Sequence, residues 1–224
     1  VAGINFIVGG HDHFLFEQPL SVPNPGGTQT LIFQAGEYYQ HVGKLVFTVN
    51  NGAVTVNNYQ MLSVDAFVPA EPTIQGIVES LKEGIVATYG DVYQTKIGKA
   101  KHDLNKLFDA ASPVRDTPMG NLITDAFRGK THTQVALTAT GLISEKIYAG
   151  PIVGADVFRS LSYGLDQNTG LGFTLATFRI SGSELVKGLE LGLAQIEYTE
   201  DLFIQVSGMS FSYTLKRPAG NRVI

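Results

Sequence analysis

Apolar and polar residues alternate along the first quarter of the chain, and this period of two predicts β-strands. The pattern indicates strands at Ile4–Val8, Leu31–Phe33, Val42–Thr48 and Ala53–Leu62. The last two are separated by Asn50-Asn51-Gly52. An Asn-Gly pair between alternating apolar residues is the strongest short signal for a β-hairpin. We therefore predict a β-rich region that ends near residue 64.

The period changes to that of a helix from Glu71 onwards. Apolar residues recur at helical spacing while charged ones occupy the opposite face, and the apolar set is Ile74, Ile77, Val78, Leu81, Ile85 and Tyr89. Pro69 and Pro72 precede this stretch, and proline is well tolerated in the first turn of a helix. We predict a linker over residues 65–91 that contains one amphipathic helix.

The remaining sequence, residues 92–224, mixes the two periods and predicts a second domain of α+β class. Thr117 as N-cap and Gly129 as a stop delimit a helix over Pro118–Arg128, and Ser181-Gly182-Ser183-Glu184 fits a capping box that opens a helix through Leu193. The predicted strands of this region are Val92–Lys99, Val135–Thr138, Phe173–Ile180, Leu202–Val206 and Met209–Leu215.

Composition narrows the function classes. The 224 residues are 44% hydrophobic and 16% charged, which is typical of a packed globular protein. A net charge of -4 argues against binding to a nucleic-acid polymer. Because the chain has no cysteine, disulfides, thiolate metal sites and a cysteine nucleophile are excluded. No stretch has the roughly 20 apolar residues of a membrane span, and the first residues do not resemble a signal peptide.

Two histidines follow the first predicted strand, in the sequence Gly9-Gly10-His11-Asp12-His13. The glycines permit a tight turn, and an extended His-x-His step would point both imidazoles to the same side. This arrangement predicts that His11 and His13 bind a metal and that Asp12 points away from them. A surface loop with two solvated histidines is the alternative interpretation, because short motifs also occur by chance.

Several motifs in order resemble those of the 5'-nucleotidase family of two-domain, bimetal phosphohydrolases. Ile7–His13 resembles the last metal-binding loop of the family, and Gln34–Tyr38 with Val42–Leu45 resembles the strand pair that closes its catalytic domain. Met119–Ala126 is similar to the first helix of the C-terminal domain, and Ile180–Leu185 to a later helix start. The stretch ending in Leu161-Ser162-Tyr163-Gly164 resembles one that ends in Pro-Phe-Gly in relatives.

The resemblance implies a fold and a domain organisation. Residues 1–64 would be the C-terminal part of a four-layer α/β/β/α metallophosphatase domain, and residues 65–91 the linker. Residues 92–224 would be the mixed α/β C-terminal domain that binds substrate, shortened at its end. Because the upstream metal carboxylates of the family are not in this sequence, we expect the chain to be the back half of a longer enzyme and to be inactive alone.

The resemblance also implies the chemistry. Two divalent ions, zinc, manganese or similar, would activate a hydroxide that releases phosphate from a nucleotide. Carried over by position, His11 would bind one ion and His13 the other. Relatives can have Gln or Asn at the place of His13, whereas His is usual in the wider metallophosphatase group, and imidazole suits zinc, manganese or iron. No residue of this chain is predicted to act as a catalytic acid or base.

The substrate residues implied by the resemblance are Tyr163, Arg115 and Gly141. Tyr163 stands where relatives place the first of two aromatic rings that stack on the base, although a tyrosine after a helix also packs in many proteins. Gly141 belongs to the run that corresponds to Asn-Gly-Gly-Gly-Ile-Arg in relatives, and there the arginine is replaced by Ser144. Arg115 is the nearest candidate for another substrate arginine, with a role in charging and capping the next helix as the alternative.

Because Ser144 replaces an arginine of relatives, the sequence does not determine which phosphoester is the substrate. The first hypothesis is a nucleotide substrate, and a family member that acts on cyclic nucleotides, nucleotide sugars or another phosphoester is the second. A binding module with a degenerate substrate site, without catalysis, is the third. By resemblance alone we expect a periplasmic or extracellular location.

Overall fold

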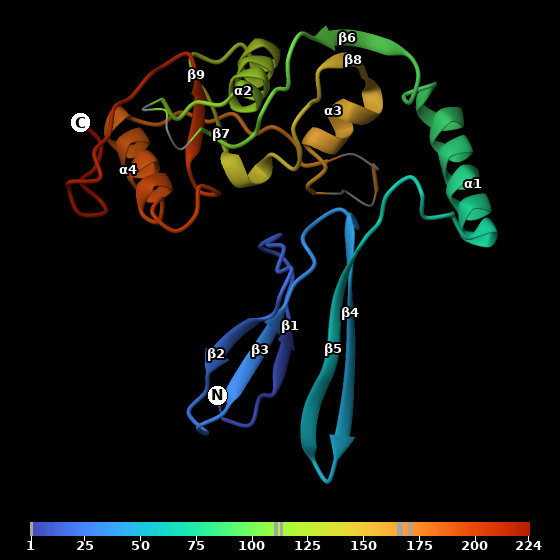
Figure 1. The fold of residues 1–224 in the computed structure, drawn as a ribbon. Helices are drawn as coiled ribbons and strands as arrows, with labels where there is room; N and C mark the ends of the chain where they lie inside the picture. Colours follow the sequence, from blue (N-terminus) through green and yellow to red (C-terminus); the bar gives the residue numbers. More distant parts are fainter. Residues whose placement is uncertain (1, 110–111, 113, 165–167, 170–171) are drawn as a thin grey trace. The chain divides into compact units, whose positions relative to one another are not determined.

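The computed structural model describes residues 2–109, 112, 114–164, 168–169 and 172–224. The chain divides into two compact units, Val1–Leu81 and Lys82–Ile224 (Figure 1). Within the described residues, no helix is both long enough and apolar enough to cross a membrane.

The first unit contains a small mixed sheet. Its strands are β1 (Phe6–Val8), β2 (Leu20–Pro23) and β3 (Gln29–Phe33), in the order β1-β3-β2. β1 runs parallel to β3, and β2 runs antiparallel to it (Figure 1). Because β1 and β3 are parallel neighbours, the loops that follow them begin at the same edge of the sheet.

The long hairpin of this unit confirms the prediction from Asn50-Asn51-Gly52. β4 (His41–Asn50) pairs antiparallel with β5 (Ala53–Ser63) (Figure 1). Asn51 and Gly52 both have positive φ, 49° and 81°, as a two-residue turn of type I′ requires. Aromatic rings join the hairpin to the small sheet, with Phe6 5.2 Å from Phe47 and Phe33 4.8 Å from Tyr59 between ring centroids.

The predicted amphipathic helix is also confirmed, as α1 (Pro72–Tyr89). Glu71 starts it, because its carboxylate accepts the backbone N–H of Ile74 at 2.8 Å. That hydrogen bond and those from Thr73 lower the pKa of Glu71, since they favour its charged form. None of the side chains of α1 is buried.

In its described residues the second unit combines two short antiparallel sheets with three further α-helices after α1, and it confirms the α+β class. Strand β6 (Lys96–Ala100) pairs with β8 (Gly150–Val153), and β7 (Ala136–Ala139) pairs with β9 (Ile204–Ser207). The helical elements are α2 (Pro118–Thr131), the 3-10 turn η1 (Thr140–Leu142), α3 (Gly154–Ser160) and α4 (Gly182–Leu193). Helix α2 packs on β7 and β9 (Figure 1).

The buried core of this unit lies around α2. Its centre is formed by Ala100, Met119, Ile123, Ile143 and Ile147, with Leu104, Phe127, Ile152 and Leu161 packed against it. Thr117 caps α2 as predicted, since its hydroxyl accepts the backbone N–H of Gly120 at 2.9 Å. The capping box of α4 is also confirmed, with Ser181 and Glu184 bonded in both directions.

Several element boundaries differ from those predicted, and two of them lie furthest from the prediction. Helix α2 continues past Gly129 to Thr131 and ends where His132 adopts a left-handed φ of 54° and donates its N–H to the carbonyl of Arg128. Strand β6 begins at Lys96 and not at Val92, because Asp91 closes a turn by accepting N–H groups from Gln94 and Thr95, each at 3.0 Å.

Two predicted strands, Phe173–Ile180 and Met209–Leu215, are wrong. Neither segment forms a strand, although both alternate apolar and polar residues. Alternation indicates only that a segment suits a pleated surface, and a strand also needs a hydrogen-bonded neighbour. Among the described residues, the second segment makes one isolated bridge, between Tyr213 and Val223, and no strand pairs with the first.

A buried amide joins the parts of this unit. Gln205, in β9, is 1% exposed. Its Oε1 atom accepts the backbone N–H of Thr117 at 3.0 Å, and its Nε2 atom donates to the carbonyl of Arg115 at 3.2 Å and to the Thr140 hydroxyl at 3.3 Å. Gly120 leaves room for the amide, because a Cβ atom there would lie 2.6 Å from Cδ of Gln205.

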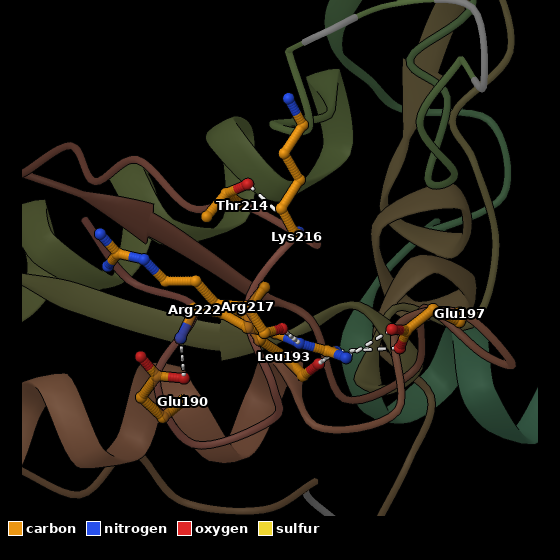
Figure 2. A network of polar contacts seen from close by, with 7 residues as sticks. All are labelled: Glu190, Leu193, Glu197, Thr214, Lys216, Arg217 and Arg222. Atoms are coloured by element: carbon orange, nitrogen blue, oxygen red, sulfur yellow. Dashed lines mark hydrogen bonds and ion pairs between the residues drawn. The ribbon is translucent and has the colours of Figure 1, made fainter.

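The C-terminal segment is held on α4 by buried charges (Figure 2). Glu190 accepts the backbone N–H groups of Arg222 at 2.9 Å and Val223 at 2.6 Å. The Arg222 guanidinium pairs with Glu197 and donates to the carbonyl of Leu193. Arg222 lowers the pKa of Glu197, so the stabilisation from this pair is complete above the usual value of 4.5 and is lost as the pH falls through the lowered pKa.

We predict that Glu190→Ala lowers the free energy of unfolding by about 3 kcal/mol, because two backbone N–H groups lose their acceptor in a buried place. Urea unfolding measures the loss, and hydrogen exchange at the backbone N–H groups of Arg222 and Val223 should become faster. Glu83→Ala, the same change at an exposed position of α1, is the control and should stay within about 0.5 kcal/mol of the parent. Equal effects of the two variants would contradict this role of Glu190.

Candidate functional site

The loops after β1 and β3 lie against each other at the edge of the small sheet. Gly9 donates its backbone N–H to the carbonyl of Phe33 at 2.8 Å, and Gly36 donates to the carbonyl of Phe14 at 3.0 Å. Leu15 and Ala35 form an antiparallel bridge between them. The loop that carries His11 and His13 is therefore fixed by the loop after β3.

The predicted extended conformation of the His-x-His step is wrong. His11 and His13 both have left-handed backbones, with φ of 71° and 61°. The turn closes tightly because Asp12 donates its N–H to the carbonyl of Gly10 at 2.8 Å. The argument that extended alternation aims both imidazoles to one side, and Asp12 away, therefore does not apply.

Left-handed residues other than glycine gather in these two loops. In the facing loop, Tyr38 and Tyr39 have φ of 53° and 56°. Each such residue costs about 1–3 kcal/mol, and such residues cluster at functional sites because surrounding contacts impose them. The backbone strain at His11 and His13 is independent of the motif and supports a functional role for this loop.

Two residues of the second loop contact His13. The Nδ1 atom of His13 lies 2.6 Å from Oε2 of Glu37. Gln34 is 7% exposed, and with its amide turned so that both ends are satisfied, its oxygen accepts the N–H groups of Phe14 at 2.9 Å and His13 at 3.3 Å. A Cβ atom at Gly9 would lie 2.6 Å from this amide, which explains the glycine.

Sequence reasoning missed Gln34 and Glu37 as site residues. It assigned Gln34–Tyr38 only to a strand pair, because apolar alternation does not show where a polar side chain points. The available signal was a glycine followed by an acidic residue directly after a buried strand.

The first unit carries two side chains of a kind that can bind a metal. Imidazoles are suitable ligands for zinc and manganese, and two of them lie on one short turn. Among the residues that the structure describes, no three His, Cys, Asp or Glu side chains form a group that could hold an ion. The donors present therefore fit a metal in kind, and further ligands are needed for a complete site.

In the second unit the structure brings the run around Gly141 close to the segment that carries Tyr163. Ser144 is 5% exposed, and its hydroxyl accepts the backbone N–H of Ser162 at 3.2 Å and lies 3.1 Å from the Ser162 hydroxyl. Its own N–H donates to the carbonyl of Ser160 at 2.9 Å. Ser144, which replaces the expected arginine, thus fixes the backbone next to Tyr163, whose side chain is 47% exposed.

Gly141 has a structural reason to be glycine. Its N–H donates to the carbonyl of Asp201 at 2.8 Å, and a Cβ atom here would lie 2.8 Å from Cβ of Asp201 and 3.0 Å from its carbonyl oxygen. The close approach of the two backbones therefore excludes a side chain.

Arg115 lines a groove that does not include Gly141 or Tyr163. Its guanidinium is 4.5 Å from the centre of the Phe108 ring and donates to the carbonyl of Asp109 at 3.0 Å. Asp116, Asn121 and Lys216 help to line this groove of about 910 Å³, whereas Gly141 and Tyr163 do not. Arg115 does not cap α2, because Thr117 does so.

The charge of Arg115 acts on a half-buried acid. Burial raises the pKa of Glu200, while the N–H of Phe108 at 3.4 Å and the Arg115 charge oppose that rise. Glu200, which does not line the groove, is therefore a carboxylate whose charged form is poorly solvated, and the Arg115 charge offsets part of this effect.

The second unit matches a known protein family over most of its length. Residues 96–224 match the family described as "5'-nucleotidase, C-terminal domain". The crystal structure of a 5'-nucleotidase precursor from Thermus thermophilus is similar over the whole chain, with a TM-score of 0.80 and 31% identity, and this similarity covers 45% of that protein.

Curated relatives agree with this match. The trifunctional nucleotide phosphoesterase protein YfkN of Bacillus subtilis (strain 168) is 26% identical over the whole chain, which spans 15% of that protein. A 5'-nucleotidase of Diplobatis ommata is 24% identical, and the chain spans 41% of its length. The chain therefore spans less than half of the length of these relatives.

The match over residues 96–224 covers more than half of the chain and defines its family. The chain belongs to the 5'-nucleotidase family, whose C-terminal domain forms residues 96–224. The resemblance inferred from the motifs is thereby confirmed. The metal and substrate residues predicted from the sequence stay predictions.

We predict opposite effects of alanine at two glycines. Gly141→Ala should lower the free energy of unfolding by about 2 kcal/mol, since overpacking against the Asp201 backbone forces a shift. Gly129→Ala, in the open interior of α2 with no atom within 4 Å of the added Cβ, should raise it by up to about 1 kcal/mol. Thermal unfolding of both variants tests this, and a neutral Gly141→Ala would leave ligand binding as the reason for that glycine.

Proposed function

We propose that the whole protein is a metal-dependent phosphohydrolase that releases phosphate from nucleotides. The observation that carries this proposal is the strained histidine turn beside the β3 loop, in a chain whose second unit belongs to the 5'-nucleotidase family. Relatives named as a nucleotide phosphoesterase and a 5'-nucleotidase support the reaction class.

In this proposal His11 and His13 each contribute an imidazole to one of two divalent ions, zinc or manganese. When bound, such a pair of ions activates water and neutralises the charge that develops on phosphorus. The role of this chain is to position the two imidazoles, because the turn at Asp12 holds the loop and Gln34 and Glu37 contact His13. The remaining ligands would come from the metallophosphatase half that the family resemblance places upstream.

Tyr163 is proposed to stack on the base of the nucleotide. It is half exposed, and it precedes Gly164, whose φ is 75°. The ring of Phe173, itself 77% exposed, lies against Gly164. Two exposed aromatic rings beside one turn provide the flat apolar surface that a base requires.

Ser144 favours a second candidate, a phosphoester other than a nucleoside monophosphate. Its hydroxyl is buried and bonded to Ser162, so it does not replace the charge of an arginine. Losing a bidentate arginine removes a strong contact to phosphate or ribose. Cyclic nucleotides and nucleotide sugars therefore belong in the substrate panel.

The proposed location is periplasmic or extracellular. The name of the Thermus protein as a precursor supports export, because exported proteins are made with a segment that is later removed.

We expect the full-length gene product with manganese or zinc to release phosphate from 5'-AMP, and to lose this activity with chelator. His11→Ala and His13→Ala should each abolish release, because each removes an imidazole ligand. His102→Ala, at an exposed site in the second unit, is the matched control and should keep the activity of the parent. A folded protein that binds two metals but releases phosphate only from other phosphoesters would support the second candidate, and activity unaffected by chelator would refute the metal mechanism.

Tyr163→Ala should raise KM for 5'-AMP about tenfold with little change in kcat, since stacking on one base contributes about 1–3 kcal/mol. Tyr198→Ala removes a ring that is 90% exposed in the same unit and should leave KM unchanged. Steady-state kinetics with 5'-AMP measure KM and kcat of both variants. If the two variants have the same KM, Tyr163 does not bind the base.

A further inference from the structure

We infer that Glu37 is a positioning residue that holds the imidazole of His13 with its proton on Nδ1 and its lone pair on Nε2. This inference rests on the proposed function, in which His13 is a metal ligand. It adds a residue of the second loop to the site, because the choice of ring nitrogen decides whether His13 can bind an ion at all.

The distance between the two side chains assigns the proton. Oε2 of Glu37 lies 2.6 Å from Nδ1 of His13. An ionised carboxylate offers only lone pairs, so at this separation a hydrogen on Nδ1 makes the contact attractive, whereas a bare Nδ1 would make it repulsive. A neutral imidazole has one protonated nitrogen, and its Nε2 atom is then free to bind a metal.

The contact between Glu37 and His13 matters because the carboxylate oxygen involved is buried. The Oε2 atom of Glu37 is buried, and among the residues that the structure describes no donor, His13 included, meets it with full hydrogen-bond geometry. A buried acceptor without a partner is costly, so this oxygen depends on the imidazole N–H. An ordinary surface ion pair lacks this dependence, because water satisfies both partners.

The backbone around Glu37 fixes its position. Gly36 before it and Tyr38 after it are both left-handed, with φ of 76° and 53°. Gly36 is bonded to the carbonyl of Phe14, next to His13. The Tyr38 ring lies 6.0 Å from the His13 ring at an angle of 57°, and so flanks the imidazole. The carboxylate and the imidazole are therefore held by two loops that are bonded to each other.

Carboxylates that accept from a ligating histidine fix its tautomer and orientation in metal sites, and their removal typically weakens metal affinity about 10- to 100-fold. We expect an effect of that size on zinc binding when Glu37 is replaced. Gln at this position keeps the shape, but its amide can present either an acceptor or a donor to Nδ1.

The test reads the His13 tautomer directly. Long-range ¹H–¹⁵N NMR spectra of the metal-free chain distinguish the two tautomers, and they are recorded at about pH 8, above the ordinary pKa of a histidine side chain. The parent should show His13 protonated on Nδ1, and Glu37→Gln should convert a large fraction to the Nε2 form. Glu17→Gln removes the same charge at an exposed position four residues from His13 and is the matched control. Zinc affinity of the parent, of Glu37→Gln and of His13→Ala is then measured by titration calorimetry.

A tautomer change in Glu37→Gln, absent from Glu17→Gln, together with roughly tenfold weaker zinc binding supports the inference. An unchanged tautomer in Glu37→Gln overturns it, whatever the metal affinity. If the tautomer changes but His13→Ala binds zinc as well as the parent does, the ring-orienting role of Glu37 holds and the proposed metal role of His13 fails. The failure of the inference and that of the proposed function are thus distinguished.

Discussion

Gln205 satisfies three polar groups that the folding of the second unit buries together. The N–H of Thr117 belongs to the cap of α2, the carbonyl of Arg115 to the segment before it, and the hydroxyl of Thr140 to the turn after β7. Burying any of these groups unpaired would cost free energy, so α2, β7 and β9 must meet in one register. Because Gly141 follows Thr140 and Ser144 bonds to Ser162, this register also determines where the segment of Tyr163 lies. The candidate substrate residues therefore depend on an amide that contacts none of their side chains.

The sequence predicted elements whose signals are local. The hairpin turn at Asn51-Gly52, the cap at Thr117 and the capping box at Ser181 each involve a few adjacent residues, and all three are present. The strands predicted at Phe173–Ile180 and Met209–Leu215 failed because a strand depends on a partner that is distant in sequence. Helix α2 continues past Gly129 because residue type alone does not fix its end. The helix ends where the backbone N–H of His132 donates to the carbonyl of Arg128.

Some features of the candidate site could be predicted from the sequence, and others required the fold. The histidine motif could be found from the sequence, and so could the family, because both depend on residue types in order. The left-handed turn at His11 and His13, the role of Gln34 and the contact of Glu37 could not, because each arises where two separate loops meet. Likewise, the replacement of an arginine by Ser144 was visible in the sequence, whereas its bond to Ser162 required the fold.

The positive φ angles at His11 and His13 have a consequence for protein engineering. Glycine adopts this backbone without steric cost, so a screen for thermal stability would favour glycine at both positions. Each such substitution would relax the turn and delete an imidazole at once. Stability and the proposed metal binding therefore make opposite demands on the same two residues, and a variant selected only for heat resistance would lose the proposed ligands first.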